Sequence, residues 1–410
     1  MALSHSNPPS RSDIAFTRTQ RHELLLTLGT GGVVIVPTET IYGAAIDAAN
    51  PKAVSLLRDM ITVTSGNPKV YPPFTWHASS LQRVHEVIEF ADPSHPYILS
   101  RVMPGPVRVI HFVNEARSAR IYRELQVDPG VIDAGGEFAL RVPGHEALRE
   151  FLLEAQANSM AIAMVGLQAL GIANCDQLTE EDEARCVTLG AGVIVNNGPT
   201  RFRTPSITVE LVHGGYRVQE PGTKALTAIT PGQIRESIKM NILFVCTGNT
   251  CRSPMAEAIA RDLLMKEGVL TASAVTAAHQ PIHVESAGVA ASAGEEMTAN
   301  AKIALEQMGV HPGEHRSRPI DSGALLRADY IFTLTRSHLR ALENLKHESR
   351  SEKDQSAHAS KMSKAQVLDP EGSDVPDPFG GPITLYQSTA QRMRELIRVR
   401  FIEMGLIKPS

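Results

Sequence analysis

The sequence predicts an α/β protein that is built from two domains. Short apolar runs typical of buried strands alternate with longer stretches typical of helices along most of the chain. At ~100–200 residues per domain, 410 residues are enough for two or three domains. A stretch with paired prolines and glycines, 220–237, precedes a new apolar run at Met240, so we place the boundary near residue 238. We expect a disordered N-terminus at 1–15, a first domain at 16–225, a linker at 226–239 and a second domain at 240–407.

The composition excludes several classes of protein. With 42% apolar and 20% charged residues the chain is not a largely disordered one. Forty basic and forty-four acidic residues give a net charge of −4, which argues against strong, sequence-independent binding of nucleic acid. No apolar run reaches the ~18 residues of a membrane helix, and the N-terminus lacks the apolar core of a secretory signal. Four cysteines are too few for a disulfide scaffold, so we expect a cytoplasmic protein with reduced thiols and no membrane partner.

The first domain begins with a helix-like stretch, Thr19–Leu28, and continues with the apolar run Val33–Val36, which predicts a buried strand. The sequence Pro37-Thr38-Glu39-Thr40 closes that strand and places hydroxyls at its C-terminal end, where α/β folds bind small molecules. A rigid turn, Pro104-Gly105-Pro106, precedes another apolar strand. Taken alone, each of these segments indicates no more than a turn between two elements of secondary structure.

Four segments of the first domain, taken together and in order, resemble the Sua5/YciO/YrdC family. They are VPTETIYG at 36–43, PGPVRVI at 104–110, LRVPGH at 140–145 and PSITVEL at 205–211. Members of this family make threonylcarbamoyl-adenylate from threonine, bicarbonate and ATP for tRNA modification, and their fold has been linked to double-stranded RNA binding. The resemblance implies a twisted mixed sheet with helices. It also implies a residual ligand site formed by Thr38, Thr40, Arg141 and Ser206.

The first domain departs from this family where ATP should bind. Active members carry a Lys-x-Arg-Pro element after the first helix, but the stretch 64–73 retains only Lys69 nearby. The Ser-Ala-Asn-x-Ser-Gly loop of the family should fall near 163–171, which reads AMVGLQALG, without a hydroxyl or amide in the expected places. Gln219-Glu220 replaces a late arginine. Because each lost charge-assisted hydrogen bond is worth ~1.5–3 kcal/mol, we expect a degenerate domain, catalytically dead or altered, for which ATP is a doubtful cofactor.

Three hypotheses remain open for the first domain. Its surviving polar residues could bind a small carboxylate or a nucleotide fragment. The domain could instead be a non-enzymatic module that presents RNA, a nucleotide or a protein partner to the second domain. In the third hypothesis the protein is bifunctional, and the first domain still makes threonylcarbamoyl-adenylate. Release of pyrophosphate from ATP in the presence of threonine and bicarbonate would single out the third.

The second domain opens with Asn241–Val245, an apolar run suited to a central parallel strand, which leads directly into CTGNTCRSP at 246–254. The helix that follows has apolar residues on one face and stops at Gly268, and Pro254 suits its first turn. A strand, a six-residue loop and a helix in this order turn backbone N–H groups inward at the positive end of the helix dipole. The segment therefore predicts an anion cradle of phosphate size.

The residue types of this loop suit a nucleophilic phosphatase. A thiolate is a strong nucleophile, and the loop N–H groups, the helix terminus and Arg252 all favour the ionised sulfur of Cys246. Arg252 also offers a planar fork for two phosphoryl oxygens, and Ser253 can donate a hydrogen bond to the sulfur. Gly248 and Asn249 are best able to adopt the positive φ that a tight loop needs. The phosphate-binding loop comprises Thr247, Gly248, Asn249, Thr250 and Cys251.

A phosphatase of this type also needs an acid that protonates the leaving group. The sequence Asp377-Pro378-Phe379-Gly380-Gly381 lies about 130 residues downstream of the cysteine. Pro378 fixes the backbone beside Asp377, and the two glycines allow the loop to fold over a cleft. Asp377 is therefore the candidate general acid. The polar stretch that precedes this loop, 347–364, predicts a mobile surface loop.

From about residue 240 to 407 the chain resembles the low-molecular-weight protein-tyrosine phosphatase family. The matching segments are CTGNTCRSP at 246–254, VESAG at 284–288, HRSRP at 315–319, ADYIFTLT at 328–335 and DPFGG at 377–381. The resemblance implies a Rossmann-like parallel sheet flanked by helices, and a two-step reaction through a cysteinyl-phosphate on a phosphorylated protein, without a metal or cofactor. The implied roles are nucleophile for Cys246, phosphate clamp for Arg252, thiolate partner for Ser253, loop organiser for Asn249 and general acid for Asp377.

Thr250 bears on the choice of substrate. The tyrosine-specific members usually carry an aliphatic β-branched residue at this position, whereas protein-arginine phosphatases of the family carry threonine. Together with DPFGG at 377–381, Thr250 favours phosphoarginine over phosphotyrosine. Arsenate reductases of the same fold need further cysteines, and none follows Cys251. Cys251 could form a reversible disulfide with Cys246 under oxidants, or act as a small packing residue.

Overall fold

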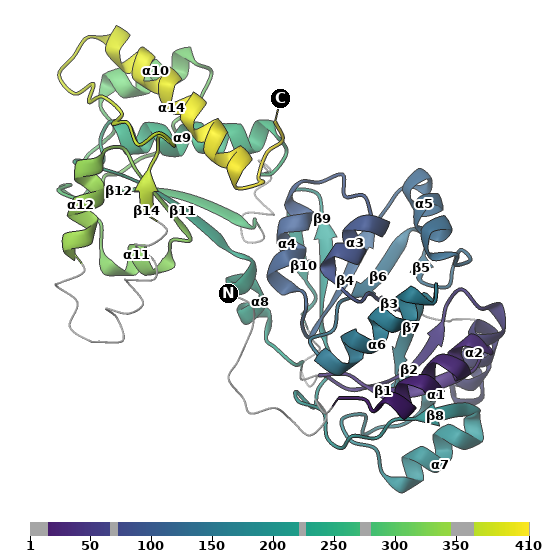
Figure 1. Cartoon of the computed structure of the whole chain (residues 1–410). Helices are drawn as coiled ribbons and strands as arrows, with labels where there is room; N and C mark the ends of the chain where they lie inside the picture. Colours follow the sequence, from purple (N-terminus) through teal and green to yellow (C-terminus); the bar gives the residue numbers. More distant parts are fainter. Residues whose placement is uncertain (1–14, 66–72, 221–226, 271–279, 346–364, 410) are drawn as a thin grey trace. The chain divides into compact units, whose positions relative to one another are not determined.

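The computed structural model describes residues 15–65, 73–220, 227–270, 280–345 and 365–409. They form two compact units that divide between Ile238 and Lys239, apart from the short segment Asp92–Ser94 (Figure 1). None of the helices in these ranges combines the length and the apolar composition that crossing a bilayer requires. The predictions made for the first 14 residues and for the polar loop at 347–364 lie outside the described residues.

The first unit is a mixed sheet covered by helices. Within the described residues the strands run in the order β10-β9-β4-β6-β3-β7-β2-β1-β8, with β5 paired to β6. The pairs β1–β8, β3–β6 and β4–β9 are parallel, and the other neighbours are antiparallel. The strands are β1 (Val33–Pro37), β2 (Tyr42–Asp47), β3 (Thr75–His77), β4 (Val107–Phe112), β5 (Asp133–Ala134), β6 (Glu137–Arg141), β7 (Ile162–Gly166), β8 (Ala191–Ile194), β9 (Ile207–Val212) and β10 (Gly215–Val218). This mixed sheet confirms the expected class of the first domain.

Strand β1 shows why the first unit needs helices on both faces of its sheet. Its residues are apolar and all are buried, so alternate side chains enter two different cores. Val33 and Ile35 belong to the larger core, whereas Val34 and Val36 pack in a smaller core with side chains of α1 and α6. The helices of the unit are α1 (Arg18–Gly29), α2 (Pro51–Ser65), α3 (Leu81–Val87), α4 (Ser94–Val102), α5 (Glu115–Leu125), α6 (Glu146–Ala157), the 3₁₀ turn η2 (Leu167–Leu170), α7 (Glu180–Leu189) and α8 (Pro231–Ile238).

The stretch 226–239, expected as a linker, is in large part the helix α8, which corrects that expectation. Ile234 and Ile238 are fully buried in the larger core of the first unit. Pro231 is the first residue of the helix, where its missing N–H costs no hydrogen bond. The Pro-Gly pair in this stretch therefore marks the start of a helix, not a break in the structure.

The second unit is a parallel sheet with helices on both faces, which confirms the class expected for the second domain. Among the described residues the strand order is β12-β11-β13-β14. The strands are β11 (Met240–Cys246), β12 (Ile282–Gly288), β13 (Tyr330–Thr333) and β14 (Ala365–Val367). The helices are α9 (Arg252–Lys266), α10 (Ala299–Gln307), α11 (Ser322–Arg327), α12 (Arg336–Leu345) and α14 (Ile383–Glu403).

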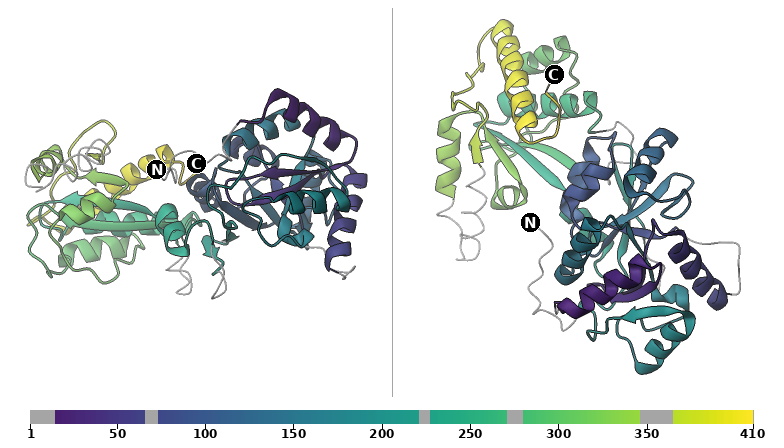
Figure 2. Two further views of the ribbon diagram at one scale, coloured as in Figure 1. Left: turned by 90° about the horizontal axis from the view of Figure 1, so that it is seen from below. Right: turned by 45° about the vertical axis from the view of Figure 1, so that its right-hand side comes forward.

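Alternation along β11 assigns the helices of the second unit to the two faces of the sheet. Leu243 and Val245 pack with side chains of α11 and α12. The ring of Phe244 faces the other way and stacks on Phe332, over which the Arg400 guanidinium of α14 lies. Helix α9 and the yellow helix α14 lie side by side on that second face (Figures 1 and 2).

The parallel strands bring several chemically useful residues to one edge of the sheet. The register pairs Cys246 with Gly288 and Val245 with Thr333, at the C-terminal ends of β11, β12 and β13. In α/β sheets this is the edge at which ligands bind, because loops and helix N-termini converge there. The candidate site lies at this edge.

Candidate active site

The phosphate-binding loop connects β11 to α9. Cys246 is the last residue of the strand and Arg252 is the first residue of the helix, so 247–251 lie at the helix N-terminus. Pro254 falls in the first helical turn, as expected. The first N–H groups of a helix have no partner within the helix and add to the positive end of its dipole. The loop can therefore hold a dianion of phosphate size.

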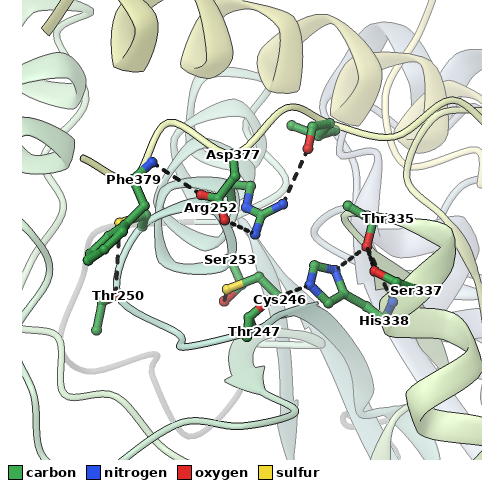
Figure 3. Close-up of polar contacts among 12 residues, drawn as sticks. Cys246, Thr247, Thr250, Arg252, Ser253, Thr335, Ser337, His338, Asp377 and Phe379 are labelled. Atoms are coloured by element: carbon green, nitrogen blue, oxygen red, sulfur yellow. Dashed lines mark hydrogen bonds and ion pairs between the residues drawn. The ribbon is translucent and has the colours of Figure 1, made fainter. Parts of the chain in front are cut away.

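The sulfur of Cys246 lies beside a hydroxyl group and a backbone N–H. Its Sγ lies 3.0 Å from Oγ of Ser253, and the backbone N–H of Asn249 donates to it at 3.3 Å. The close-up shows Cys246 and Ser253 together beneath the guanidinium of Arg252 (Figure 3). Donors of this kind stabilise a sulfur anion over a thiol.

A positive backbone angle shapes the loop at Asn249. Its φ is 55°, as expected, whereas Gly248, expected to share this conformation, is not among the residues with positive φ. Gly288 lies against the loop at very close range. A Cβ at that position would come within 2.4 Å of the carbonyl oxygen of Thr247 and 2.9 Å of the Asn249 nitrogen. Only glycine therefore fits beneath this turn.

The side chain of Asn249 ties the loop to its surroundings. Its amide nitrogen donates to Oγ of Ser253 and to Oγ of Ser286, both at 2.9 Å. Its amide oxygen accepts from the backbone N–H of Arg318 at 2.9 Å, and His315 Nε2 donates to its carbonyl oxygen at 2.7 Å. These bonds come from α9, from β12 and from the segment 315–318. The side chain and the carbonyl oxygen of Asn249 thus hold the loop in its shape.

Arg252 and Asp377 face each other at the entrance of the loop. Nη2 of Arg252 lies 2.5 Å from Oδ2 of Asp377, and Nη1 donates to the carbonyl oxygen of Val375 at 3.4 Å. The arginine side chain is 6% exposed, whereas the aspartate side chain is 50% exposed. The carboxylate is further held by the N–H of Phe379, which donates to Oδ1 at 3.2 Å. A carboxylate and a guanidinium therefore stand together above the sulfur (Figure 3).

A buried imidazole supports the loop from the side of α12. Nε2 of His338 lies 2.9 Å from Oγ1 of Thr247, and its Nδ1 lies 2.9 Å from Oγ1 of Thr335 (Figure 3). Burial, and then the nearby Arg252 guanidinium, lower the pKa of His338 to about 4. The imidazole is therefore neutral at neutral pH, and a neutral ring can link the two hydroxyls by accepting from one and donating to the other.

We expect His338→Asn to slow turnover and His338→Gln to do so less. An asparagine amide can replace Nδ1 but not Nε2, so it loses the bond to Thr247, whereas a glutamine amide can reach the position of Nε2. One hydrogen bond is worth about 0.5–1.5 kcal/mol, which corresponds to a roughly 2- to 10-fold loss of kcat/KM. Steady-state kinetics of both variants on one phosphopeptide would measure it. Equal losses in both variants would contradict a role through Thr247.

Thr250 and Cys251 complete the loop. The carbonyl oxygen of Thr250 accepts from the N–H of Thr298 at 3.0 Å. The sulfur of Cys251 lies 3.3 Å from Oγ1 of Thr298 and 3.8 Å from the hydroxyl of Tyr386. Burial, and then the hydrogen bond with Cys251, raise the pKa of Tyr386. Both Cys246 and Cys251 are free thiols in this structure, and Cys251 is buried beside Thr298 and Tyr386.

The four residues proposed as a residual ligand site in the first unit also lie together. Oγ1 of Thr40 lies 2.9 Å from Oγ1 of Thr38 and 3.5 Å from Oγ of Ser206, and Nη1 of Arg141 donates to it at 3.0 Å. A cavity of about 420 Å³ lies beside them. Gln168 also lines this cavity, so the stretch 163–171, expected to lack a hydroxyl or amide in the places that the family uses, still contributes an amide. The stretch that holds Lys69 lies outside the described residues.

The comparison with known proteins decides the family of the second domain. Residues 241–403 match the family described as low molecular weight phosphotyrosine protein phosphatase. Over 159 residues, which are 39% of this chain and 93% of the relative, the sequence is 32% identical to a protein-arginine-phosphatase of Bacillus subtilis. The chain belongs to the low molecular weight phosphatase family. It is a cysteine-dependent protein phosphatase.

Further matches were found for both domains. The phosphatase domain is 30% identical over 161 residues to the low molecular weight protein-tyrosine-phosphatase PtpB of Staphylococcus aureus, covering 38% of this chain and 94% of that one. It also matches the structure of the YwlE arginine phosphatase from Geobacillus stearothermophilus, at 28% identity, with 40% of this chain and 92% of that one covered and a TM-score of 0.32. Residues 27–222 match the Sua5/YciO/YrdC family, described as telomere recombination. The chain is thus a fusion of two families.

Three residues of the phosphatase site received no role in the sequence analysis. Ser286 and His315, which hold Asn249, lie inside the segments VESAG and HRSRP, so the resemblance itself could have identified them. His338 lies three residues beyond the segment ADYIFTLT, and nothing in the sequence distinguishes it from other histidines on helices. Its contact with Thr247 depends on the packing of α12 against the sheet.

Proposed function

We propose that the second domain hydrolyses phosphoarginine in proteins, with Cys246, Arg252 and Asp377 as its catalytic residues. The observation that carries this proposal is the convergence of three groups at one helix N-terminus. A sulfur that accepts from a loop N–H and lies beside a hydroxyl, a buried guanidinium and a half-exposed carboxylate meet there. This is the set that phosphoryl transfer through a covalent intermediate requires.

In the first step the Cys246 thiolate attacks phosphorus. The bond between phosphorus and the leaving nitrogen breaks, and a bond between sulfur and phosphorus forms. The loop N–H groups and Arg252 stabilise the charge on the phosphoryl oxygens during transfer. Asp377, protonated, donates its proton to the departing guanidine nitrogen, so arginine leaves as a neutral group that is then protonated by solvent.

In the second step water attacks the cysteinyl-phosphate. Asp377, now ionised, accepts a proton from the water, the sulfur–phosphorus bond breaks, and inorganic phosphate and the thiolate are released. Ser253, 3.0 Å from the sulfur, stabilises the thiolate as it leaves. Each bond made or broken is served by a group of the chain itself, so we propose that neither metal nor cofactor takes part.

Two observations favour phosphoarginine as the substrate. Relatives named protein-arginine-phosphatase are 32% and 31% identical to this domain. Thr250 places a hydroxyl in the loop, where the β-branched aliphatic residue of a tyrosine-specific enzyme would present only methyl groups to the leaving group. Phosphotyrosine remains the second candidate, because the PtpB relative is 30% identical and the exposed ring of Phe379 stands beside Asp377 at the entrance.

The experiment is a comparison of phosphoarginine and phosphotyrosine peptides of the same sequence, using the wild type and Thr250→Ile. We expect the wild type to prefer phosphoarginine, and Thr250→Ile to shift the ratio of the two kcat/KM values towards phosphotyrosine by roughly tenfold or more. Thr250→Ser, which keeps the hydroxyl, is the matched control and should retain the preference. A wild type that prefers phosphotyrosine would overturn the proposed substrate and leave the phosphatase chemistry intact.

A further inference from the structure

The acid loop, residues 377–381, is exposed and takes its local shape from a turn of its own. The side chain of Asp377 is 50% exposed. The N–H of Gly381 donates at 2.9 Å to the carbonyl oxygen three residues earlier, and Gly380, third in this turn, has a φ of 76°. A type II turn has a positive φ at its third residue, a conformation that favours glycine. Together with the N–H of Phe379, the turn fixes the carboxylate relative to its own loop but not relative to the nucleophile (Figure 3).

The ion pair with Arg252 holds the carboxylate only until a phosphoryl group takes its place. Nη2 of Arg252 lies 2.5 Å from Oδ2 of Asp377. In the proposed first step this guanidinium binds phosphoryl oxygens and Asp377 carries a proton, and both changes weaken the ion pair. Other contacts must then keep the acid near the leaving group. Upstream of the acid, the N–H of Val375 donates to the carbonyl oxygen of Leu334 at 2.8 Å and fixes that side of the loop.

Downstream of the acid, the loop meets Tyr386, a buried residue at the start of α14. Burial, and then the hydrogen bond with Cys251, raise the pKa of Tyr386, so the phenol keeps its proton at neutral pH. The hydroxyl of Thr298 and the N–H of Gly380 form hydrogen bonds that lower this pKa, as donors to the phenol oxygen do. A phenolic hydroxyl both donates and accepts, so it can serve these neighbours together.

The contacts with Cys251 and Thr298 connect Tyr386 to the phosphate-binding loop. Sγ of Cys251 lies 3.8 Å from the Tyr386 hydroxyl and 3.3 Å from Oγ1 of Thr298. The N–H of Thr298 donates to the carbonyl oxygen of Thr250 at 3.0 Å. Cys251 directly precedes Arg252, the first residue of α9. The hydroxyl of Tyr386 thus joins the two loops, since it meets the residue beside the phosphate clamp and the turn that follows the acid.

We propose that Tyr386 is a positioning residue that keeps the acid loop beside the phosphate-binding loop during proton donation. This inference rests on the proposed role of Asp377 as the general acid. Without the phenol hydroxyl, the N–H of Gly380 loses its partner within the protein and can turn to water instead, because the acid loop is exposed. The turn is then free to move away from the leaving group, and proton donation becomes slower.

The test is Tyr386→Phe, which removes the hydroxyl and keeps the ring that fills the space. We expect kcat on a phosphoarginine peptide and on phenyl phosphate to fall roughly 2- to 10-fold, the effect of one hydrogen bond. Hydrolysis of p-nitrophenyl phosphate, whose leaving group needs no proton, should change by less than about twofold. The inhibition constant of inorganic phosphate should stay the same, and circular dichroism would show that the fold is retained.

Tyr330→Phe is the matched control. Tyr330 is the first residue of β13, and its register partner is Ile242, at the end of the sheet opposite to Cys246. Its ring stacks on Phe332, a contact that phenylalanine keeps. This variant makes the same chemical change in the same unit, and it should match the wild type on all three substrates.

A double variant separates positioning from a general loosening of the site. If Tyr386 acts through the acid, its hydroxyl has nothing left to position once Asp377 is replaced by alanine. We therefore expect Tyr386→Phe combined with Asp377→Ala to hydrolyse phenyl phosphate as Asp377→Ala alone does, within about twofold. A hydroxyl that only stabilised the phosphate-binding loop would also lower p-nitrophenyl phosphate hydrolysis, and the two losses would multiply.

Three results would overturn the inference: wild-type kcat in Tyr386→Phe on every substrate, an equal loss on all three substrates, or losses that multiply in the double variant. Each of them leaves the proposed function intact, provided that Asp377→Ala alone shows the dependence on the leaving group. If Asp377→Ala alone loses activity equally on all three substrates, the acid role itself fails, and the positioning role of Tyr386 fails with it.

Discussion

Replacing Cys246 by serine is expected to abolish phosphatase turnover, by a factor on the order of 10⁴ or more. The serine hydroxyl fits the space and can keep contacts with Ser253 and the N–H of Asn249. However, an alkoxide is far harder to generate than a thiolate, and no neighbouring base is positioned to take the hydroxyl proton within the described site. The measurement is single-turnover and steady-state kinetics on a phosphoarginine peptide, with circular dichroism to show that the fold is retained.

The matched control for this variant is Cys175→Ser. Cys175 is a buried thiol of the first unit whose Sγ donates to the carbonyl oxygen of Ile172 at 2.9 Å, a bond that serine can also make. This variant should keep full phosphatase activity. Turnover by Cys246→Ser close to that of the wild type would exclude the cysteinyl-phosphate mechanism, whereas loss in both variants would indicate general damage to the protein.

Asp377→Ala is expected to lower turnover by roughly 10²- to 10⁴-fold on substrates with basic leaving groups. Arginine and unsubstituted phenol leave poorly without a proton, and in the structure the carboxyl that would supply it stands beside the phosphate clamp Arg252. A p-nitrophenolate leaves without help, so hydrolysis of p-nitrophenyl phosphate should fall much less. The measurement is the ratio of kcat values for phosphoarginine, phenyl phosphate and p-nitrophenyl phosphate.

Asp374→Asn provides the matched control. Asp374 lies three residues earlier in the same loop, and its carboxylate accepts from the N–H of Arg336 and not from Arg252. This variant should show the same dependence on the leaving group as the wild type. An equal loss on all three substrates in Asp377→Ala would argue against proton donation and would reduce the residue to an ion-pair partner of Arg252.

The sequence predicted most of the fold because its strands are strongly apolar. The runs at 33–36 and 241–245 appear as β1 and β11, each extended by one or two residues. The helix α8 was missed because Pro231 and Gly232 indicate a break when read locally, although a proline is well suited to a first helical turn. What decides between these readings is the burial of Ile234 and Ile238 in a core formed by distant segments, and a local pattern carries no information about that burial.

The sequence predicted the reactive residues of the phosphatase site but did not predict every residue that holds them in place. Cys246, Arg252 and Ser253 lie within eight residues, so their spacing alone indicates their proximity. The resemblance to a family placed Asp377 beside them, as the ion pair with Arg252 now shows. The position of His338 follows from tertiary packing, because α12 carries this side chain to the loop.

The anchoring of Asn249 and the tight fit of Gly288 have a consequence for inhibition. Because hydrogen bonds with residues outside the phosphate-binding loop set its shape, the loop has the same conformation before a substrate arrives and after the leaving group has gone. Its donors recognise a tetrahedral oxyanion and make no distinction as to what was attached to it. We therefore expect released phosphate to compete with incoming substrate, and sulfate and vanadate to compete in the same way, so that the product slows turnover.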